Sequence, residues 1–469
     1  MLDWNKLLNS KRRKDIDKED SGSKTAAGRL EVERDYDRIL FSTPVRRLAD
    51  KTQVFPLEIN DSVRTRLTHS HEVSNIARSI GIAIAFDADL IDKSHIPQRT
   101  IPSMLAAIGL AHDLGNPPFG HQGEYTIQSW FKENLEVFED PNITEPMKMD
   151  FVNFEGNAQT LRLVTRLQVL NDNYGLNLTY GTLAALMKYP VGTNAIDNGN
   201  VATKKHGYFQ SEEKIVEEIW EETGLASGVR HPLTFIMESC DDIAYSVVDA
   251  EDSVKKGLVS FSDLMSFLKH HENENKVIKN VIEQSTETHQ EYRKASLSPS
   301  ELNDISTQMF RVYSISQMVQ DVKKSFIQNY DSIMAGELKQ QDLLSKTDSG
   351  ELYKVLKKFD REHGYQHRSV LEIELQGYQY IRGLMSFLWD AIIDREKTED
   401  LKSGRNNPFS SYTYGRISEN YRRVFEQDDG IPIRYKELQL LTDMVSGMTD
   451  TFVISLFKEL RNFHEITDS

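Results

Sequence analysis

The sequence contains a single cysteine, Cys240, among 469 residues. One thiol excludes an internal disulfide framework and a zinc site built on several cysteines, so any metal would be bound by histidine and carboxylate groups. No uninterrupted apolar run reaches membrane-spanning length, and the charges of residues 1–20 alternate too often for a secretory signal. We therefore expect a cytoplasmic protein with no membrane partner.

Strand-like alternation of apolar and polar residues is also rare, and VFPLEI (54–59) is the nearest example. The 13 prolines gather in loops such as GNPPFG (115–120) and DPNITEP (140–146). Helical spacing is common instead, because apolar residues recur every three or four positions over residues 72–86, 103–112, 157–170, 233–248, 258–268 and 378–393. These patterns predict an all-α fold.

An excess of basic charge is absent as well, since the net charge is −16. This balance argues against a protein whose whole surface binds nucleic acid. It does not exclude a small polyanion such as a nucleotide, because a few arginines and lysines in one pocket are enough to bind it.

Two polar stretches suggest how the chain is organised. Residues 10–30 are charged and contain SGSKTAAG, which is typical of a mobile arm or loop. Residues 270–301 are either a domain junction or a charged helix followed by a loop. We expect an N-terminal arm over 1–30, a core over 31–270 and a helical C-terminal region over 271–469.

The stretch RTRLTHSHEVSNIARSIG (64–81) contains two histidines that cannot face the same way in a helix. Each helical residue turns by about 100°, so His69 shares a face with the apolar residues 73, 76 and 80. His71 lies on the opposite, polar face. An inward histidine is either a metal ligand or a hydrogen-bonded core residue, and this helix alone leaves both interpretations open.

A second stretch, MLAAIGLAHDLGNPPFGHQGE (104–124), leads an apolar helix into His112 and Asp113. Burial of an adjacent histidine and aspartate is costly unless a partner satisfies them, and a divalent cation would do so. The alternative is a helix C-terminus in which Asp113 pairs with the chain and His112 interacts with the helix dipole.

A third stretch, PLTFIMESCDDIAYSVVDAED (232–252), places Asp241, Tyr245 and Asp249 four residues apart on one helix face. This face is either part of a site or a solvated acidic surface.

These elements, in this order, resemble the deoxyguanosine triphosphate triphosphohydrolases, which are metal-dependent HD-domain phosphohydrolases. The motifs that carry the resemblance are ERDYDRILFSTPVRRLADKTQVFPL (33–57), RTRLTHS (64–70), AHDLGNPPFGHQGE (111–124), FEGNAQTLRLVTRL (154–167), GLNLTYGTLAALMKYP (175–190) and DDIAYSVVDAED (241–252). The resemblance is strong from near Trp4 to about residue 255 and weaker beyond. It implies a helical HD-domain core and a helical C-terminal region that completes the active site and makes subunit contacts.

The activity implied by the resemblance is hydrolysis of dGTP to the deoxynucleoside and inorganic triphosphate, by attack of water at the α-phosphorus. The implied metal ligands are His69, His112, Asp113 and Asp241, with Asp241 preferred to Asp242 because it heads the stripe described above. The metal is Mg²⁺ or Mn²⁺, with Fe, Co, Ni or Zn as alternatives. His71 is left without a role.

Two further groups of residues follow from the motif positions. His121 is the implied acid or base, and Glu124 would orient its imidazole; their order of proton transfer stays open. The implied substrate-binding residues are Gln53 for the base edge, Tyr245 and Asp249 for the sugar, and Arg66, Asn116, Lys188, Tyr189 and Lys205 for the phosphates.

The sequence departs from one common family pattern at Gly156, where many members have histidine. The glycine form accompanies Asn116 in a subgroup that includes strict dGTP hydrolases, which favours dGTP over other deoxynucleoside triphosphates. The family also implies a homo-oligomer, a hexamer, and a single-stranded DNA or dNTP effector. Two alternatives remain: an HD hydrolase of another nucleotide phosphoester, and a catalytically weak nucleotide or single-stranded DNA sensor.

Overall fold

The computed structural model describes residues 1–16, 28–58, 60–86, 95–168, 172–339, 342–467. In these residues the secondary structure is helical, and the only β pairings are three isolated bridges, Arg12–Thr179, Thr52–Thr65 and Arg395–Arg405. The prediction of an all-α fold is confirmed. Residues 54–58 of the most strand-like run form bends and a turn, and Pro56 within the run has no N–H to donate to a β-ladder.

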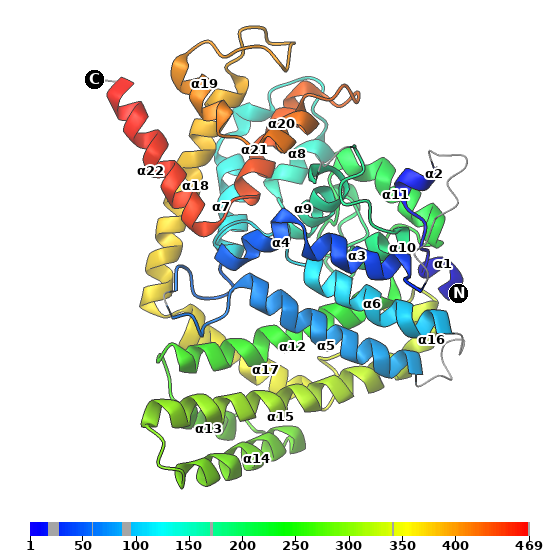
Figure 1. Cartoon of the computed structure of the whole chain (residues 1–469), viewed down its shortest axis with the longest axis vertical. Coiled ribbons are helices and arrows are strands. Elements are labelled where there is room, and N and C mark those ends of the chain that lie inside the picture. The colour runs from blue at the N-terminus through cyan, green and yellow to red at the C-terminus, as the bar shows by residue number, and fades with distance from the viewer. Residues whose placement is uncertain (17–27, 59, 87–94, 169–171, 340–341, 468–469) are drawn as a thin grey trace.

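Among the described residues, the first part of the chain forms the helices α1 to α12 (Figure 1). They are α1 (Trp4–Leu7), α2 (Arg13–Ile16), α3 (Glu31–Leu40), α4 (Thr43–Arg47), α5 (Arg66–Phe86), α6 (His95–Ala111), α7 (Gly120–Glu133), α8 (Glu145–Val152), α9 (Gly156–Arg162), α10 (Tyr180–Leu186), α11 (Glu213–Thr223) and α12 (Pro232–Lys255).

The remaining helices are α13 (Phe261–His270), α14 (Lys276–Arg293), α15 (Pro299–Gln328), α16 (Tyr330–Met334), α17 (Gly350–Phe359), α18 (Arg368–Ile393), α19 (Pro408–Gly415), α20 (Glu419–Phe425), α21 (Ile433–Ser446) and α22 (Asp450–Thr467). A π-helical turn, Asp360–Tyr365, follows α17. The charged stretch 270–301 contains α14, which packs against α13 and α15.

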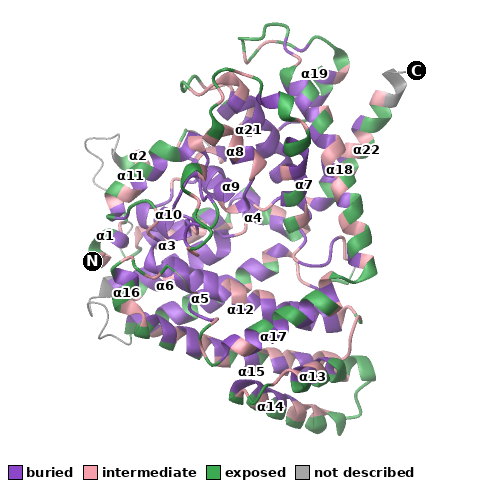
Figure 2. Cartoon of the chain, turned by 180° about the vertical axis from the view of Figure 1, so that it is seen from behind, coloured by how far each residue is buried: buried purple, intermediate pink, exposed green. Residues whose placement is uncertain are grey.

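The centre of the fold is formed by α5, α6 and α12. Helices α5 and α6 pack along each other, and α12 contacts both of them as well as α10, α15 and α17. Figure 2 shows buried residues gathered on these central helices, whereas α14 and α22 carry many exposed residues. The apolar stripes found in the sequence therefore face a common core, and the polar residues that share these helices are carried into it.

One cluster of buried apolar side chains joins all three predicted regions, since it contains Leu7, Leu105 and Leu460. The described part of the N-terminal arm is packed, with the backbone N–H of Leu2 donating to the Met334 carbonyl at 2.6 Å. Residues 17–27, on which the expectation of a mobile arm centres, lie outside the described residues. The three-part division remains a prediction from the sequence.

No single helix among the described residues is long and apolar enough to cross a membrane. Helices α21 and α22 reach the required length and composition only together, and their axes meet at 116°.

Candidate active site

Three predicted metal ligands converge from three different helices. His69 lies on α5, His112 directly follows α6, and Asp241 lies on α12. His69 Nε2 is 3.1 Å from Asp241 Oδ1, and His112 Nε2 is 3.5 Å from the same oxygen. One ligand atom from each of the three residues lies within 4.8 Å of the other two, which is close enough for all three to bind one metal ion.

The donor atoms of this group suit a divalent cation. His112 Nδ1 lies 2.7 Å from the Gly109 carbonyl and donates to it, so Nε2 is the nitrogen that faces the two carboxylates and could bind a metal once deprotonated. His112 Nε2 is buried and has no hydrogen-bond partner among the described residues. A buried imidazole lone pair beside carboxylate oxygens is a typical environment for a metal ion.

Asp113 lies beside this group but is held by other residues. Its Oδ1 is 3.6 Å from His112 Nε2 and accepts a hydrogen bond from the Asn116 amide at 2.6 Å. Its Oδ2 forms an ion pair with Arg66. The predicted fourth ligand is therefore within reach of the group, while one of its oxygens is already neutralised by a cation.

The pKa values of these residues reflect their closeness. Burial acts to lower the pKa of His112, but the Asp113 and Asp241 carboxylates outweigh it and raise that pKa to about 9. Burial acts in the opposite direction on Asp113, where Arg66 and His112 prevail and lower its pKa to about 2. The two carboxylates thus stabilise the protonated, positively charged form of His112, and a bound metal cation would take the place of the proton on its imidazole.

His121 and Glu124 occupy the first turn of α7. His121 Nδ1 is 3.4 Å from Glu124 Oε2, and the other Glu124 oxygen accepts from the Gly156 N–H at 2.8 Å. The hydrogen bond to Glu124 raises the pKa of His121. Burial acts to raise the pKa of Glu124, but the same hydrogen bond acts against burial, and that pKa is lowered overall. Glu124 is 10% exposed and fixed, whereas the His121 side chain is 84% exposed to the cavity, as a proton donor or acceptor must be.

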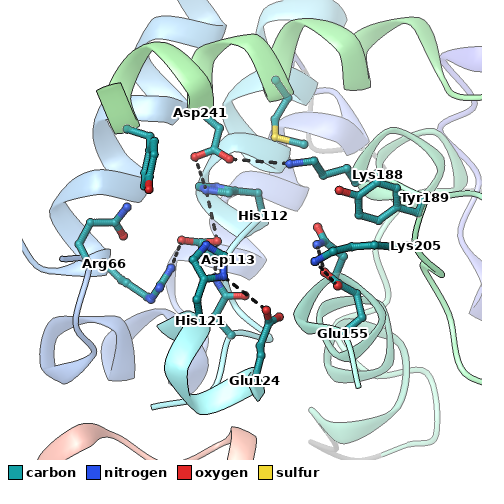
Figure 3. Close-up of a pocket in the computed structure, with 15 residues that line it drawn as sticks. Arg66, His112, Asp113, His121, Glu124, Glu155, Lys188, Tyr189, Lys205 and Asp241 are labelled. Atoms are coloured by element: carbon teal, nitrogen blue, oxygen red, sulfur yellow. Dashed lines mark hydrogen bonds and ion pairs between the residues drawn. The ribbon is translucent and has the colours of Figure 1, made fainter. Parts of the chain in front are cut away.

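Figure 3 shows these groups around one cavity, with Lys188, Tyr189 and Lys205 on the wall facing His112 and Glu124. The cavity is lined by Gln53, Arg66, His112, Asp113, Asn116, His121, Glu124, Glu155, Asn157, Lys188, Tyr189, Lys205, Met237, Asp241 and Tyr245. Lys188 lies 3.5 Å from Glu238, and Lys205 pairs with Glu155 at 2.5 Å. The predicted phosphate-binding cations therefore share one cavity with the metal ligands and with the predicted acid–base pair.

Two predicted site residues do not line this cavity. His69 is 0% exposed and reaches the site only through its ring nitrogen. Asp249 is 1% exposed and accepts a hydrogen bond from the Tyr365 hydroxyl at 2.6 Å. The role of Asp249 at the sugar stays a prediction. Tyr365 also places its ring 5.8 Å from that of Tyr245, a contact that no local sequence pattern indicates.

Comparisons with known proteins give the family. A model of the HD domain matches residues 66–144, a span that begins at Arg66 and includes His69, His112 and Asp113. The chain is 36% identical over 473 residues to a deoxyguanosinetriphosphate triphosphohydrolase-like protein of Listeria innocua, covering 98% of this chain and 99% of the relative. A protein of the same name from Listeria monocytogenes is 37% identical with the same coverage. The deoxyguanosinetriphosphate triphosphohydrolase of Salmonella typhimurium is 32% identical over 482 residues, covering 91% of this chain and 93% of that enzyme.

The chain belongs to the deoxyguanosinetriphosphate triphosphohydrolase family. The resemblance found in the sequence motifs is thereby confirmed. The HD domain is a metal-dependent hydrolase domain, and in this triphosphohydrolase family member the group His69, His112 and Asp241 provides a candidate metal site.

In this triphosphohydrolase the choice between Asp241 and Asp242 has a structural basis. Asp242 accepts a hydrogen bond from the Tyr353 hydroxyl at 2.7 Å, whereas Asp241 faces both histidines. The asymmetry of the two histidines on α5 is also visible, because His69 is buried and His71 is exposed beside α3 and α6.

Glu155 and Asn157 are cavity residues of this triphosphohydrolase that the sequence reasoning missed. They flank Gly156 in the FEGNAQ motif, so their position next to an unusual glycine was the available signal. Asn157 donates to Glu155 at 2.6 Å and helps to hold the carboxylate that faces Lys205.

At Gly156 of this triphosphohydrolase, any larger residue would place its Cβ atom against side chains that line the cavity. A Cβ atom there would lie 2.3 Å from Asn116 Oδ1 and 2.8 Å from Glu124 Oε1. We therefore expect Gly156→Ala to displace both side chains and to lower kcat by about 10-fold to 100-fold. Steady-state kinetics would measure the loss. Gly415→Ala is the matched control, because a Cβ there meets nothing within 4 Å and should leave kcat unchanged.

Proposed function

We propose that this chain hydrolyses dGTP to deoxyguanosine and inorganic triphosphate with the help of a divalent cation, Mg²⁺ or Mn²⁺, with Fe, Co, Ni or Zn as alternatives. One observation carries the proposal: a single cavity brings together three of the four predicted metal ligands, an imidazole–carboxylate pair and three cations. Binding of a nucleotide alone would require the cations but not the acid–base pair.

The reaction adds water across the bond between the α-phosphorus and the 5′-oxygen of the deoxyribose. A divalent cation held by His69, His112, Asp113 and Asp241 would neutralise charge on a phosphate oxygen and lower the pKa of a water molecule. Arg66, Lys188 and Lys205 would bind the phosphate chain, since they reach the cavity from different sides.

The proton is handled by His121. Either its imidazole takes a proton from the attacking water or its imidazolium gives one to the departing 5′-oxygen, and Glu124 stabilises the charged form in both cases. The hydroxide of the water is retained on the triphosphate, and the proton ends on the 5′-hydroxyl of the deoxynucleoside.

The base and sugar are assigned to two other residues that line the cavity, Gln53 and Tyr245. Gln53 lines it, and its Oε1 is buried with no hydrogen-bond partner among the described residues, which supports a role in reading the base edge. Tyr245 would pack on the sugar and exclude the 2′-hydroxyl of a ribonucleotide. We propose dGTP as the preferred substrate, with Asn116 and Asp249 as contacts to the α-phosphate and the 3′-hydroxyl.

The proposal is tested by identifying the products from dGTP in the presence of Mg²⁺ or Mn²⁺. We expect equal amounts of deoxyguanosine and triphosphate, and in ¹⁸O-labelled water we expect the label in the triphosphate. Release of single phosphates would instead support hydrolysis of another phosphoester. Tight nucleotide binding without turnover would support a sensor.

The assembly and the location of the protein are part of the same proposal. We propose a cytoplasmic homohexamer that uses its C-terminal region for subunit contacts and takes a dNTP or single-stranded DNA as an effector. Light scattering would show the oligomer, and a dGTPase rate that ignores added oligonucleotides and dNTPs would exclude the effector.

A further inference from the structure

The turn between α21 and α22, residues 446–450, lies against the segment 47–52 that leads into the cavity residue Gln53. We refer to residues 446–450 as the C-terminal turn. Arg47 donates to the Gly447 carbonyl at 2.9 Å, and the hydroxyl of Thr451, just after the turn, donates to Asp50. Two segments almost 400 residues apart are thus joined along their length.

Asp450 connects this turn to two different loops of the cavity. Its Oδ2 accepts hydrogen bonds from the backbone N–H and the hydroxyl of Thr52, the former at 2.9 Å. Its Oδ1 accepts from the backbone N–H of Phe119 at 2.9 Å. Asp450 is 2% exposed, so this carboxylate is a buried bridge between the residue before Gln53 and the residue before α7.

Lys51 forms a second bridge beside the first. Its ammonium group donates to the Asn116 carbonyl at 2.6 Å and to the Ser446 carbonyl at 2.7 Å, and the residue is 3% exposed. Asn116 lines the cavity and lies, like Phe119, in the loop between α6 and α7, so this bridge also ties that loop to the C-terminal turn.

The loop held in this way needs external support. Phe119 has φ 59°, in the left-handed region that a bulky side chain rarely adopts. Such a conformation persists only where surrounding contacts fix it. Phe119 directly precedes the first turn of α7, which carries His121 and Glu124, so its backbone sets the position of both.

We propose that Asp450 is a positioning residue. By fixing the backbones of Phe119 and Thr52 to the C-terminal turn, it holds the neighbouring His121 and Gln53 in place relative to each other in the cavity. It does not itself line the cavity. The kinetic consequence rests on the proposed dGTP hydrolysis, whereas the structural consequence does not.

The test compares Asp450→Asn with a matched variant remote from the cavity, Asp321→Asn. Asp321 is also buried and also accepts from the backbone N–H and the hydroxyl of one residue, Ser349, at 3.1 and 2.5 Å. Asparagine offers one acceptor oxygen in place of two, so Asp450→Asn cannot keep its bonds to both Thr52 and Phe119. Asp321 accepts both Ser349 bonds on Oδ2, so Asp321→Asn can keep them and controls for the loss of a buried charge.

The first readout is amide hydrogen exchange in the full-length protein without nucleotide. We expect exchange at Phe119 or Thr52 to rise at least about tenfold in Asp450→Asn with Ser349 unchanged, and exchange at all three amides to stay unchanged in Asp321→Asn. Unchanged exchange at both Phe119 and Thr52 in Asp450→Asn would overturn the proposal.

The second readout is kinetic. We expect Asp450→Asn to lower kcat for dGTP by about 100-fold with less than about a fivefold change in KM, and Asp321→Asn to stay within about twofold, both assayed well below their unfolding temperatures. Thr52→Ser should retain most of the rate, and the isosteric Thr52→Val should lose about tenfold.

Equal losses in the two aspartate variants would show a merely structural role. If the unmodified protein releases no triphosphate, the proposed function fails, and hydrogen exchange still decides the role of Asp450.

Discussion

His69→Ala is expected to abolish both metal binding and triphosphate release, whereas His71→Ala leaves both within a few-fold of the unmodified protein. The two residues share α5, but His69 Nε2 lies 3.1 Å from Asp241 Oδ1, and His71 is exposed on the other side of the helix. Removing an imidazole ligand should lower metal affinity by more than about 100-fold, since even the residues that orient such ligands account for about 10-fold to 100-fold.

Metal content after dialysis and triphosphate release from dGTP measure this difference, and His71→Ala is the internal control. Because His69 is fully buried, the unfolding temperature of each variant shows whether the loss is local. A chelator should reproduce the loss in the unmodified protein, and added Mg²⁺ or Mn²⁺ should reverse it. Equal losses in both variants would mean that His69 is not the ligand.

Glu124→Gln is expected to lower kcat by about 100-fold or more and to shift the pH dependence of kcat. The Glu124 carboxylate raises the pKa of His121, so glutamine should lower that pKa. Glu133→Gln is a control on the last turn of the same helix, where the side chain is half exposed, and it should change neither quantity.

Whether kcat falls or rises with pH around the His121 pKa shows which proton transfer His121 performs, a question that the sequence leaves open. If imidazolium donates a proton, activity is present below the His121 pKa and falls as pH rises through it, and Glu124→Gln moves the fall to lower pH. If neutral imidazole accepts a proton, activity rises through that pKa, and the rise moves to lower pH. A profile that does not move would contradict a role of this pair in proton transfer.

The helices and the inward direction of His69 could be predicted because they depend on local periodicity. Apolar residues spaced by three or four positions specify which side of α5 is buried, whatever that side contacts. The stretch MLAAIGLAHDLGNPPFGHQGE (104–124) likewise predicted an apolar helix that ends at the histidine–aspartate pair, and α6 ends at Ala111, directly before His112.

The positions of Asp249 and Glu155 could not be predicted in the same way. Asp249 lies on the same helical stripe as Asp241 and Tyr245, yet its carboxylate is taken by Tyr365, which is 116 residues further along the chain. Glu155 forms an ion pair with Lys205, and only the packing of separate segments brings their charged groups to 2.5 Å.

By itself the sequence determined the all-α architecture and the family, and it predicted the groups that bind a metal and transfer a proton. Those features depend on residue type and on short-range spacing, which the chain carries locally. The tertiary structure decided which of these groups share one cavity and what holds them there. Asp450 contacts Phe119 and Thr52 from 331 and 398 residues away, and a hydrogen bond across such a separation leaves no periodic signature in either partner.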